Sequence, residues 1–239
     1  MHSVDEAEIQ NFSKDSSHWW DENGPFKPLH RLNPVRLEYI KGQICDHFSL
    51  DFENRHALKG LKILDIGCGG GLVCEPMARM GADITGVDAD ANAIEVANAH
   101  ADEMGLNVTY INGAAEDLNE KYDVVLALEV IEHVIDMRGF VNTCMGLCKP
   151  DGLVIFSTLN RTAKSFALGI VAAEYILRWV PQGTHSWKKF VKPSELSRAI
   201  RSSDGSIKDI SGLIYNPITD EFSMSETDID VNYFITVKN

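Results

Sequence analysis

The chain has 239 residues, of which 44% are hydrophobic, so it is long enough for one globular domain with a sizeable core. Its 22 Lys and Arg residues stand against 35 Asp and Glu residues, which gives a net charge of −13. A chain this acidic repels a phosphate backbone, so we expect no nucleic-acid partner. The five cysteines are odd in number and form no Cys-x-x-Cys pair, which argues against a disulfide framework or a zinc site and favours a reducing compartment.

The basic residues are unevenly distributed along the chain. Residues 160–192 carry six Lys and Arg against one Glu, whereas residues 1–159 carry 12 basic and 26 acidic residues. The longest apolar stretch, 166–173, is far shorter than the roughly 20 residues that a membrane-spanning helix needs. The acidic and polar N-terminus predicts no secretory signal. We therefore expect a cytoplasmic protein that is soluble or bound to a membrane surface.

The predicted elements begin with a helical, aromatic segment at 18–40, which we interpret as a lid, followed by a polar stretch at 49–59. From residue 60 onward, short β-rich runs alternate with longer helical ones. The β-rich runs are continuously apolar, as expected for strands that are buried on both faces. Strands are expected at 62–66, 83–87, 108–111, 122–127 and 153–157, and helices at 72–80 and 91–105. This order is typical of a doubly wound α/β sheet.

A glycine-rich turn joins the first strand to a helix, which is the arrangement of a nucleotide-binding loop. Its glycines are Gly67, Gly69, Gly70 and Gly71. The dinucleotide fingerprint Gly-x-Gly-x-x-Gly fails because position 72 is leucine. Asp65 precedes the loop, where its carboxylate would repel a pyrophosphate but attract an ammonium group. The loop therefore favours an amino-acid-bearing nucleoside, although a turn that only permits tight packing is the alternative.

Two further acids follow the second and third expected strands. Asp88 ends the second strand beside the glycine loop, where it can accept hydrogen bonds from two ribose hydroxyls. Glu116 follows the third strand, where its carboxylate can accept a hydrogen bond from the exocyclic amine of adenine. Each acid has an alternative role as a helix cap.

These residues resemble the class I S-adenosylmethionine-dependent methyltransferases. The first motif of that superfamily is an acid followed by Gly-x-Gly-x-Gly, and the second ends in an acid. The resemblance covers residues 60–160 and implies a Rossmann-like fold with S-adenosylmethionine as the methyl donor. It leaves the substrate open.

Three candidate catalytic residues, Glu129, Glu132 and His133, follow the fourth strand at the end of the sheet where such folds bind ligands. Positions i, i+3 and i+4 share one face of a helical turn, so the spacing predicts that the three side chains converge on a divalent cation. Carboxylate oxygens dominate the set, which makes magnesium the expected ion. The alternative is a site without metal in which Glu132 caps or pairs and His133 hydrogen-bonds near the cofactor.

An oxygen nucleophile such as a phenol gives this cluster a chemical role. A phenol has a pKa of ~10, so only about one part in a thousand is phenolate at pH 7, a penalty of roughly 4 kcal/mol. A bound cation would stabilise the phenolate, whereas His133 as general base would remove the proton. These two roles of His133 compete.

Segments outside the shared core are similar to the ubiquinone-biosynthesis O-methyltransferases of bacteria and mitochondria. The similar strings lie at 19–21 (WWD), 26–36 (FKPLHRLNPVR), 157–161 (STLNR), 174–177 (EYIL), 183–185 (GTH), 212–217 (GLIYNP) and 231–233 (VNY). The resemblance implies a seven-stranded sheet and O-methylation of polyprenylated phenols at two steps of ubiquinone synthesis.

The same resemblance implies functional residues position by position. Cofactor contacts fall at Arg36, Gly67, Asp88 and Leu128, and the divalent cation falls at Glu129, Glu132 and His133. The family often has methionine at the position of Leu128, a change of little consequence for a contact that is mainly backbone and steric. A surface salt bridge is the alternative role for Arg36.

We divide the chain into an N-terminal lid (1–59), a cofactor-binding core (60–159), an inserted cap (160–192) and the C-terminal part of the sheet (193–239). A prenylated substrate is too apolar to diffuse freely through water, so we predict that the basic cap rests on an anionic membrane surface, at its inner face. The apolar helical face expected in the cap consists of Phe166, Ile170, Ala173 and Leu177. A core helix with solvated basic ends is the alternative.

Two other functions compete with O-methylation of a polyprenylated phenol. One is O-methylation of a small soluble phenol or acid, and the other is a subunit that binds S-adenosylmethionine without catalysis. The candidate catalytic cluster argues against the second. Other ubiquinone-biosynthesis proteins are further candidate partners.

Overall fold

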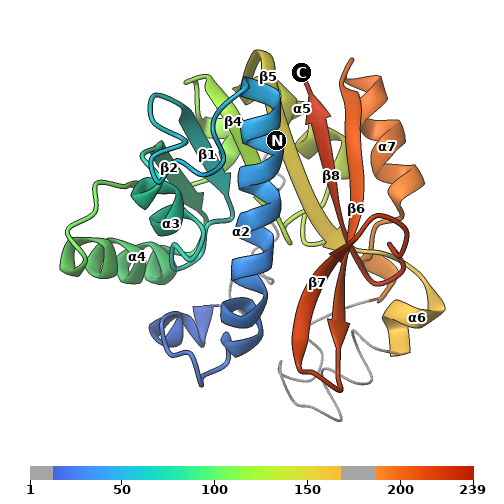
Figure 1. Ribbon diagram of the computed structural model, residues 1–239, viewed down its shortest axis with the longest axis horizontal. Coiled ribbons are helices and arrows are strands. Elements are labelled where there is room, and N and C mark those ends of the chain that lie inside the picture. Colours follow the sequence, from blue (N-terminus) through green and yellow to red (C-terminus); the bar gives the residue numbers. More distant parts are fainter. Residues whose placement is uncertain (1–12, 168–186) are drawn as a thin grey trace.

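The computed structural model describes residues 13–167 and 187–239, and within them it shows a single sheet flanked by helices (Figure 1). The strands are β1 (Lys62–Ile66), β2 (Asp83–Asp88), β3 (Thr109–Asn112), β4 (Tyr122–Leu128), β5 (Cys148–Leu159), β6 (Ser206–Asn216), β7 (Glu221–Ser225) and β8 (Asn232–Lys238). The helices are α2 (Lys27–Phe48), α3 (Cys74–Arg79), α4 (Ala91–Glu103), α5 (Met137–Leu147), α6 (Ala163–Ser165) and α7 (Pro193–Ser202). Short 3-10 helices are η1 (Ser16–His18), η2 (Ala115–Asp117) and η4 (Trp187–Lys189).

The strand order of the described sheet is β3-β2-β1-β4-β5-β8-β6-β7. Strands β1 to β5 are parallel, whereas β8 runs antiparallel to both of its neighbours. The chain leaves β1 towards β2 and β3 and then returns to β4 on the other side of β1. Doubly wound sheets bind ligands at such a switch point, beyond the carboxyl ends of the strands.

The predicted doubly wound α/β sheet is confirmed, with β1 to β4 near their expected positions. The expected number of seven strands is wrong for this chain, because β6 and β7 form an antiparallel hairpin that adds an edge strand. The hairpin turns after Asn216, whose carbonyl accepts a hydrogen bond from Asp220 N at 2.8 Å, and Asp220 has the left-handed φ that closes the turn. The expected start of the fifth strand is also wrong, because β5 begins at Cys148.

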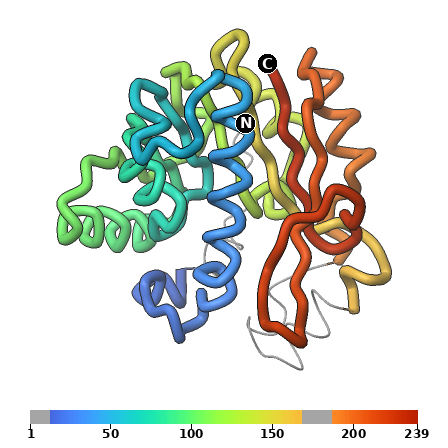
Figure 2. Tube along the Cα trace, viewed as in Figure 1, coloured from blue at the N-terminus to red at the C-terminus, as the bar shows by residue number. Residues whose placement is uncertain are grey.

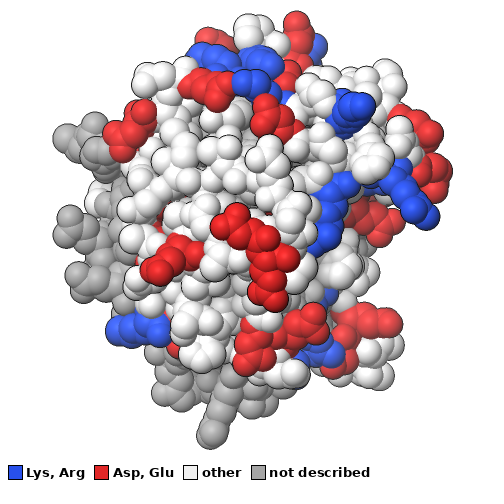
Figure 3. All heavy atoms as spheres, turned by 90° about the vertical axis from the view of Figure 1, so that its left-hand side faces the viewer, with Lys and Arg blue, Asp and Glu red and all other residues white. Residues whose placement is uncertain are grey.

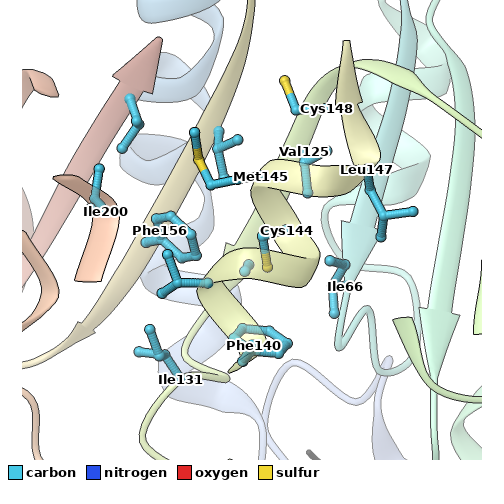
Figure 4. Packing of buried hydrophobic residues seen from close by; sticks show 14 of the residues in the cluster. Ile66, Val125, Ile131, Phe140, Cys144, Met145, Leu147, Cys148, Phe156 and Ile200 are labelled. Atoms are coloured by element: carbon cyan, nitrogen blue, oxygen red, sulfur yellow. The ribbon is translucent and has the colours of Figure 1, made fainter. Parts of the chain in front are cut away.

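The core consists of two hydrophobic clusters on opposite faces of the sheet. Alternate residues of β4 point to opposite faces: Val125 and Ala127 belong to one cluster, and Val124 and Leu126 to the other. Helices α5 and α7 cover the first face, where Phe140, Cys144 and Met145 pack on Val125 and Phe156 (Figure 4). Because both faces are covered, β1 and β4 are largely buried, as expected. The edge strand β3 departs from this expectation, because none of its residues is buried.

Helix α2 covers the second face of the sheet (Figure 1), together with α3. Ile40 and Ile44 of α2 are fully buried there. The expected helical segment at 18–40 is therefore wrong at both ends: α2 begins at Lys27, with proline in its first turn, and continues to Phe48. Most of α2 is a core helix, and only the segment before it remains a candidate lid.

Residues 13–26 lie at the lower end of α2 in Figure 2, and η1 contacts α4. The face that Figure 3 shows carries acidic side chains near its middle, in keeping with the net negative charge. Among the described residues, no helix is long and apolar enough to cross a membrane. Most of the predicted cap, including Ile170, Ala173 and Leu177, lies outside the described residues, so the four-part division of the chain stays a prediction.

Candidate active site

The loops that follow β1 and β4 meet at the switch point of the sheet. Ile66 at the end of β1 pairs with Val87 of β2 on one side and with Ala127 of β4 on the other. Gly67 has a positive φ of 71°, and a side chain there would lie 2.3 Å from Cγ2 of Val130. Glycine is required at this position on both counts. The glycine loop and the acidic loop after β4 are therefore in direct contact.

Asp88 organises the cofactor side of this junction. Its Oδ2 accepts a hydrogen bond from Gly69 N and its Oδ1 accepts one from Asp90 N, both at 2.8 Å. Partial burial raises the pKa of the Asp88 carboxyl, against the opposing effect of these two donors. A carboxylate oxygen can accept more than one hydrogen bond, so the side chain is fixed in place and can still accept hydroxyl groups.

Asp65 and Arg36 form a buried charged group beneath the same loop, with exposures of 3% and 5%. Burial raises the pKa of Asp65 to about 7, although the positive charge of Arg36 opposes the shift. Burial likewise lowers the pKa of Arg36, against the attraction of Asp65 and Glu129. Arg36 is therefore no surface residue: its guanidinium donates to Asn33 Oδ1 at 2.7 and 3.1 Å, and its charge acts on both Asp65 and Glu129.

The remaining two predicted cofactor residues lie at or after the ends of β3 and β4, which β2 and β1 separate in the sheet. Glu116 is half-buried in η2, directly after β3. Leu128 is the last residue of β4 and is 7% exposed, so its side chain can offer a bound nucleoside only van der Waals contact. The structure thus places the predicted cofactor residues along β1, β2, β3 and β4 at one edge of the sheet.

Glu129 opens the acidic loop in an unusual backbone conformation. Its φ is 57°, in the left-handed region that a residue with a side chain rarely adopts. The strand next to it holds this conformation, because Glu129 N donates to Ser157 O at 3.0 Å. Its Oε1 accepts from Ser157 Oγ at 2.6 Å and from Asn232 Nδ2 at 3.1 Å. Backbone strain of this kind is common at functional sites.

Glu132 lies next to Glu129 and is 4% exposed. Its Oε2 accepts a hydrogen bond from Thr158 Oγ1 at 2.7 Å. Burial, and then the negative charge of Glu129, raise the pKa of Glu132 well above its usual range. Two adjacent carboxyls in a dry site resist simultaneous ionisation, so this pair holds a proton readily.

The predicted helical face of Glu129, Glu132 and His133 is wrong. Residues 129–133 form a bend and a turn, because the left-handed Glu129 breaks the helical spacing. His133 is half-buried, and its backbone N donates to Val130 O at 2.9 Å. Within residues 13–167 and 187–239, no group of three His, Cys, Asp or Glu side chains is arranged to hold a metal ion.

The oxygen atoms of and around the two carboxylates nevertheless suit a hard cation. Asn232 Oδ1 is buried beside Glu129 and has no hydrogen-bond donor. Two carboxylates and an unpartnered amide oxygen are the oxygen ligands that Mg²⁺ accepts. The predicted ligands Glu129 and Glu132 are together, whereas His133 does not complete a three-residue group.

The sequence analysis did not predict the three side chains that hydrogen-bond to the carboxylates of Glu129 and Glu132, which are Ser157, Thr158 and Asn232. They lie on β5 and β8, between 26 and 103 positions away from the acids that they contact. Their only signal was that they fall within the strings STLNR and VNY, which are similar to one family.

Comparisons with known proteins agree with this geometry. A family described as "Methyltransferase domain" matches residues 37–204. The chain is 50% identical to the ubiquinone biosynthesis O-methyltransferase of Maricaulis maris (strain MCS10), over 99% of this chain and 93% of that protein. It is 48% identical to the protein of the same name from Chelativorans sp. (strain BNC1), over 98% and 93%.

Solved structures resemble the fold at low sequence identity. The magnesium protoporphyrin IX methyltransferase of Synechocystis PCC 6803, with S-adenosylmethionine bound, has a TM-score of 0.62 at 15% identity and covers both chains fully. The plantazolicin methyltransferase, in complex with S-adenosylhomocysteine and a substrate analogue, has a TM-score of 0.69 at 14% identity, over 98% of each chain. These structures support the methyltransferase fold alone.

Proposed function

Because the chain belongs to the ubiquinone biosynthesis O-methyltransferases, we propose that it transfers the methyl group of S-adenosylmethionine to phenolic hydroxyls of polyprenylated ubiquinone precursors, at both O-methylation steps. The observation that carries the proposal is the contact of Gly67 in the glycine loop with Val130, which lies in the same loop as the half-buried Glu129 and the buried Glu132. A methyl donor on the loop would have its reactive end beside two groups that can hold the proton of a hydroxyl.

The cofactor residues take complementary roles in this proposal. Asp88 accepts the ribose hydroxyls through the lone pairs that Gly69 N and Asp90 N leave free. Asp65 faces the ammonium group of the methionine part, and a positive charge there favours the ionised carboxylate. Around the same ligand, Arg36 supplies positive charge, Gly67 a backbone contact and Leu128 an apolar surface. The carboxylate of Glu116 accepts a hydrogen bond from the adenine amine.

The carboxylate pair manages the proton of the acceptor hydroxyl. A group with a raised pKa, such as Glu132, is a better proton acceptor near neutral pH than an ordinary carboxylate. Glu129 is oriented by Ser157 and Asn232, so the reacting oxygen can be held in line with the methyl group. The methyl transfer itself needs no further side chain, so the role of this pair is to handle the proton and to orient the acceptor.

We propose a second role for this cluster, which would replace proton acceptance by Glu132: Glu129, Glu132 and His133 bind a divalent cation, with magnesium as the expected ion. Bound there, such an ion would supply charge that favours the phenolate. The support is that the two carboxylates and the unpartnered Asn232 Oδ1 offer oxygen ligands. His133 would have to change position to join them, because the described residues hold no three-residue group of this kind.

Chelation separates the two roles of His133. Methyl transfer should stop in excess chelator and return when Mg²⁺ is added, while the affinity for S-adenosylhomocysteine stays unchanged. Full activity in chelator would remove the cation and leave His133 as the candidate general base, which a His133→Gln variant would then test.

The substrate class is tested with two acceptors, a polyprenylated catechol and the same catechol without its tail. We expect preference for the prenylated acceptor. A preference for the short catechol would support an enzyme of small soluble phenols. Absence of transfer to both, with normal S-adenosylhomocysteine binding, would support a subunit that binds the cofactor without catalysis.

We also propose that the protein works in the cytoplasm against the inner face of the membrane, through the basic segment 160–192 and alongside other ubiquinone-biosynthesis proteins. Lys188 and Lys189 are exposed in η4 at the end of this segment. Binding to vesicles should need anionic lipid, weaken with salt and fall on charge reversal at both lysines. Charge reversal at the exposed Lys59 is the control. Equal binding to neutral vesicles, or none to anionic ones, would contradict the membrane role.

A further inference from the structure

The segment before α2 is attached directly to the glycine loop and to the end of β2. Trp20 Nε1 donates to Gly70 O at 2.9 Å. In the second turn of α2, which follows the segment, Asn33 Nδ2 donates to Leu72 O at 2.8 Å. Ser13 Oγ donates to Asp90 Oδ1 at 3.0 Å, two residues beyond the ribose-binding Asp88. These contacts join both ends of the segment to the cofactor edge of the sheet.

Trp19 is the residue of this segment that lies against the glycine loop itself. A side chain at Gly69 would meet Trp19 Cζ2 at 2.3 Å, and one at Gly70 would meet Trp19 Cβ and Cγ at 2.4 Å. Gly70 lies outside the left-handed region, so its backbone does not require glycine. What requires glycine at 70 is the space that Trp19 takes.

The ring of Trp19 is held firmly, but its polar group has no partner. The ring stacks on Phe26 with centroids 3.8 Å apart and an angle of 5° between the planes, and His30 Nε2 contacts Trp19 O at 2.8 Å. Trp19 Nε1 is buried and has no hydrogen-bond acceptor. A buried N–H without an acceptor is costly, and buried indole groups usually find one.

We propose that Trp19 is a cofactor-binding residue whose indole N–H donates to an oxygen of S-adenosylmethionine, and that Gly70 is glycine in order to admit this ring. The edge of the ring next to Nε1 faces Gly69, which donates to Asp88, so the ribose is the nearer of the two oxygen-bearing parts of the cofactor. The inference rests on the proposed position of the cofactor on the glycine loop.

Calorimetric titration of S-adenosylhomocysteine tests it. Trp19→Phe keeps an aromatic ring against Phe26 but removes the N–H, and should weaken binding about tenfold. Gly70→Ala keeps the indole but displaces it, and should cause a similar loss. The double variant should bind no more weakly than the weaker single variant, because both changes remove one contact. Trp187→Phe, whose indole donates to Thr162 O, is the matched control.

Melting temperatures confirm that each variant folds, and tryptophan emission gives a second measurement. Addition of S-adenosylhomocysteine should change the emission of the wild type and of Trp187→Phe, and most of that change should be lost in Trp19→Phe. Repeating the titrations with 5′-methylthioadenosine, which keeps the ribose but lacks the carboxylate, locates the acceptor. Loss with both ligands identifies the ribose, and loss with S-adenosylhomocysteine alone identifies the carboxylate.

Asp88→Ala distinguishes failure of this inference from failure of the proposed site. If Asp88→Ala weakens binding while Trp19→Phe and Gly70→Ala bind both ligands as tightly as the wild type, Trp19 is no cofactor residue although the cofactor position stands. If Asp88→Ala also leaves binding unchanged, the cofactor lies elsewhere, and the inference falls with the proposed site.

Discussion

The proposed site has a cofactor half, formed by the loops after β1 and β2, and an acidic half, formed by the loop after β4. In the cofactor half, backbone N–H groups hold Asp88, and its partners lie within 19 residues of it. In the acidic half, side chains of distant strands hold Glu129 and Glu132, up to 103 residues away. The first half is therefore organised by local backbone geometry, and the second depends on the assembled sheet.

The acidic half also contains features that destabilise the fold. The acidic half contains a left-handed glutamate and a nearly fully buried carboxyl beside a second one. Such features usually cost stability and persist where function needs them. Substitutions in the acidic half should therefore reduce catalysis more than folding, and substitutions in the cofactor half should reduce affinity.

The largest effect is expected at Glu132. Glu132→Gln can still accept from Thr158 but cannot take a proton, so kcat/KM should fall about 1,000-fold, in line with the roughly 4 kcal/mol that separates phenol from phenolate at pH 7. The affinity for S-adenosylhomocysteine should not change. Glu120→Gln, at an exposed ion pair with Lys62, is the matched control. Activity within threefold of the wild type would exclude Glu132 from the chemistry.

Asp65 should make the stability of the cofactor-free protein depend on pH. Its folded pKa of about 7 lies above the ordinary value of 3.8, so the folded state retains a proton that the unfolded state has lost. The free energy of unfolding should therefore fall as pH rises from about 4 to 7, by a few kcal/mol. Asp65→Asn removes this slope and should be more stable than the wild type at pH 8, with the advantage lost near pH 4.

Urea denaturation at pH 4.5, 6 and 8 measures this dependence. Asp83→Asn, at the exposed start of β2, is the control and should follow the wild type. Parallel curves for Asp65→Asn and the wild type would show that the carboxyl stays ionised throughout this range.

Asp88→Ala should weaken S-adenosylhomocysteine binding by at least ~1.5 kcal/mol, about tenfold, because hydrogen bonds from the ribose to a charged group are lost. At saturating cofactor, kcat should stay within a few fold of the wild type. Asp102→Ala, exposed on α4, is the control for calorimetry. Unchanged affinity would refute the assignment of Asp88, and tight NADH binding would revive the dinucleotide interpretation that Leu72 opposes.

The smallest effect is expected at Ser157, which orients Glu129 without contacting the methyl group. Ser157→Ala removes the 2.6 Å hydrogen bond to Glu129, so kcat should fall about five- to tenfold at unchanged cofactor affinity. Ser157→Thr retains a hydroxyl and should restore part of the loss. Ser202→Ala, which removes an exposed side-chain bond to Arg198 O, should have no effect. Equal kcat in Ser157→Ala and the wild type would show that Asn232 alone positions Glu129.

The same division explains how far the sequence could predict the structure. Continuous apolar runs identify β1 to β4, and the cofactor residues Asp65, Gly67 and Asp88 lie where a local strand-loop pattern places them. The start of β5 was missed because the polar stretch 148–152 gives no strand signal and joins the sheet through an irregular register beside β4. The geometry of Glu129 was missed because the carbonyl of Ser157, on another strand, decides its backbone conformation.

The central claim is that a methyl donor on the cofactor half faces the carboxylates of the acidic half. A crystal structure of the protein with S-adenosylhomocysteine tests it most directly. We expect ribose hydroxyls on Asp88, the amino group towards Asp65, and the sulfur on the side of the loop that faces Glu129 and Glu132. A sulfur that points away from both carboxylates, or a ligand bound away from the glycine loop, would contradict it.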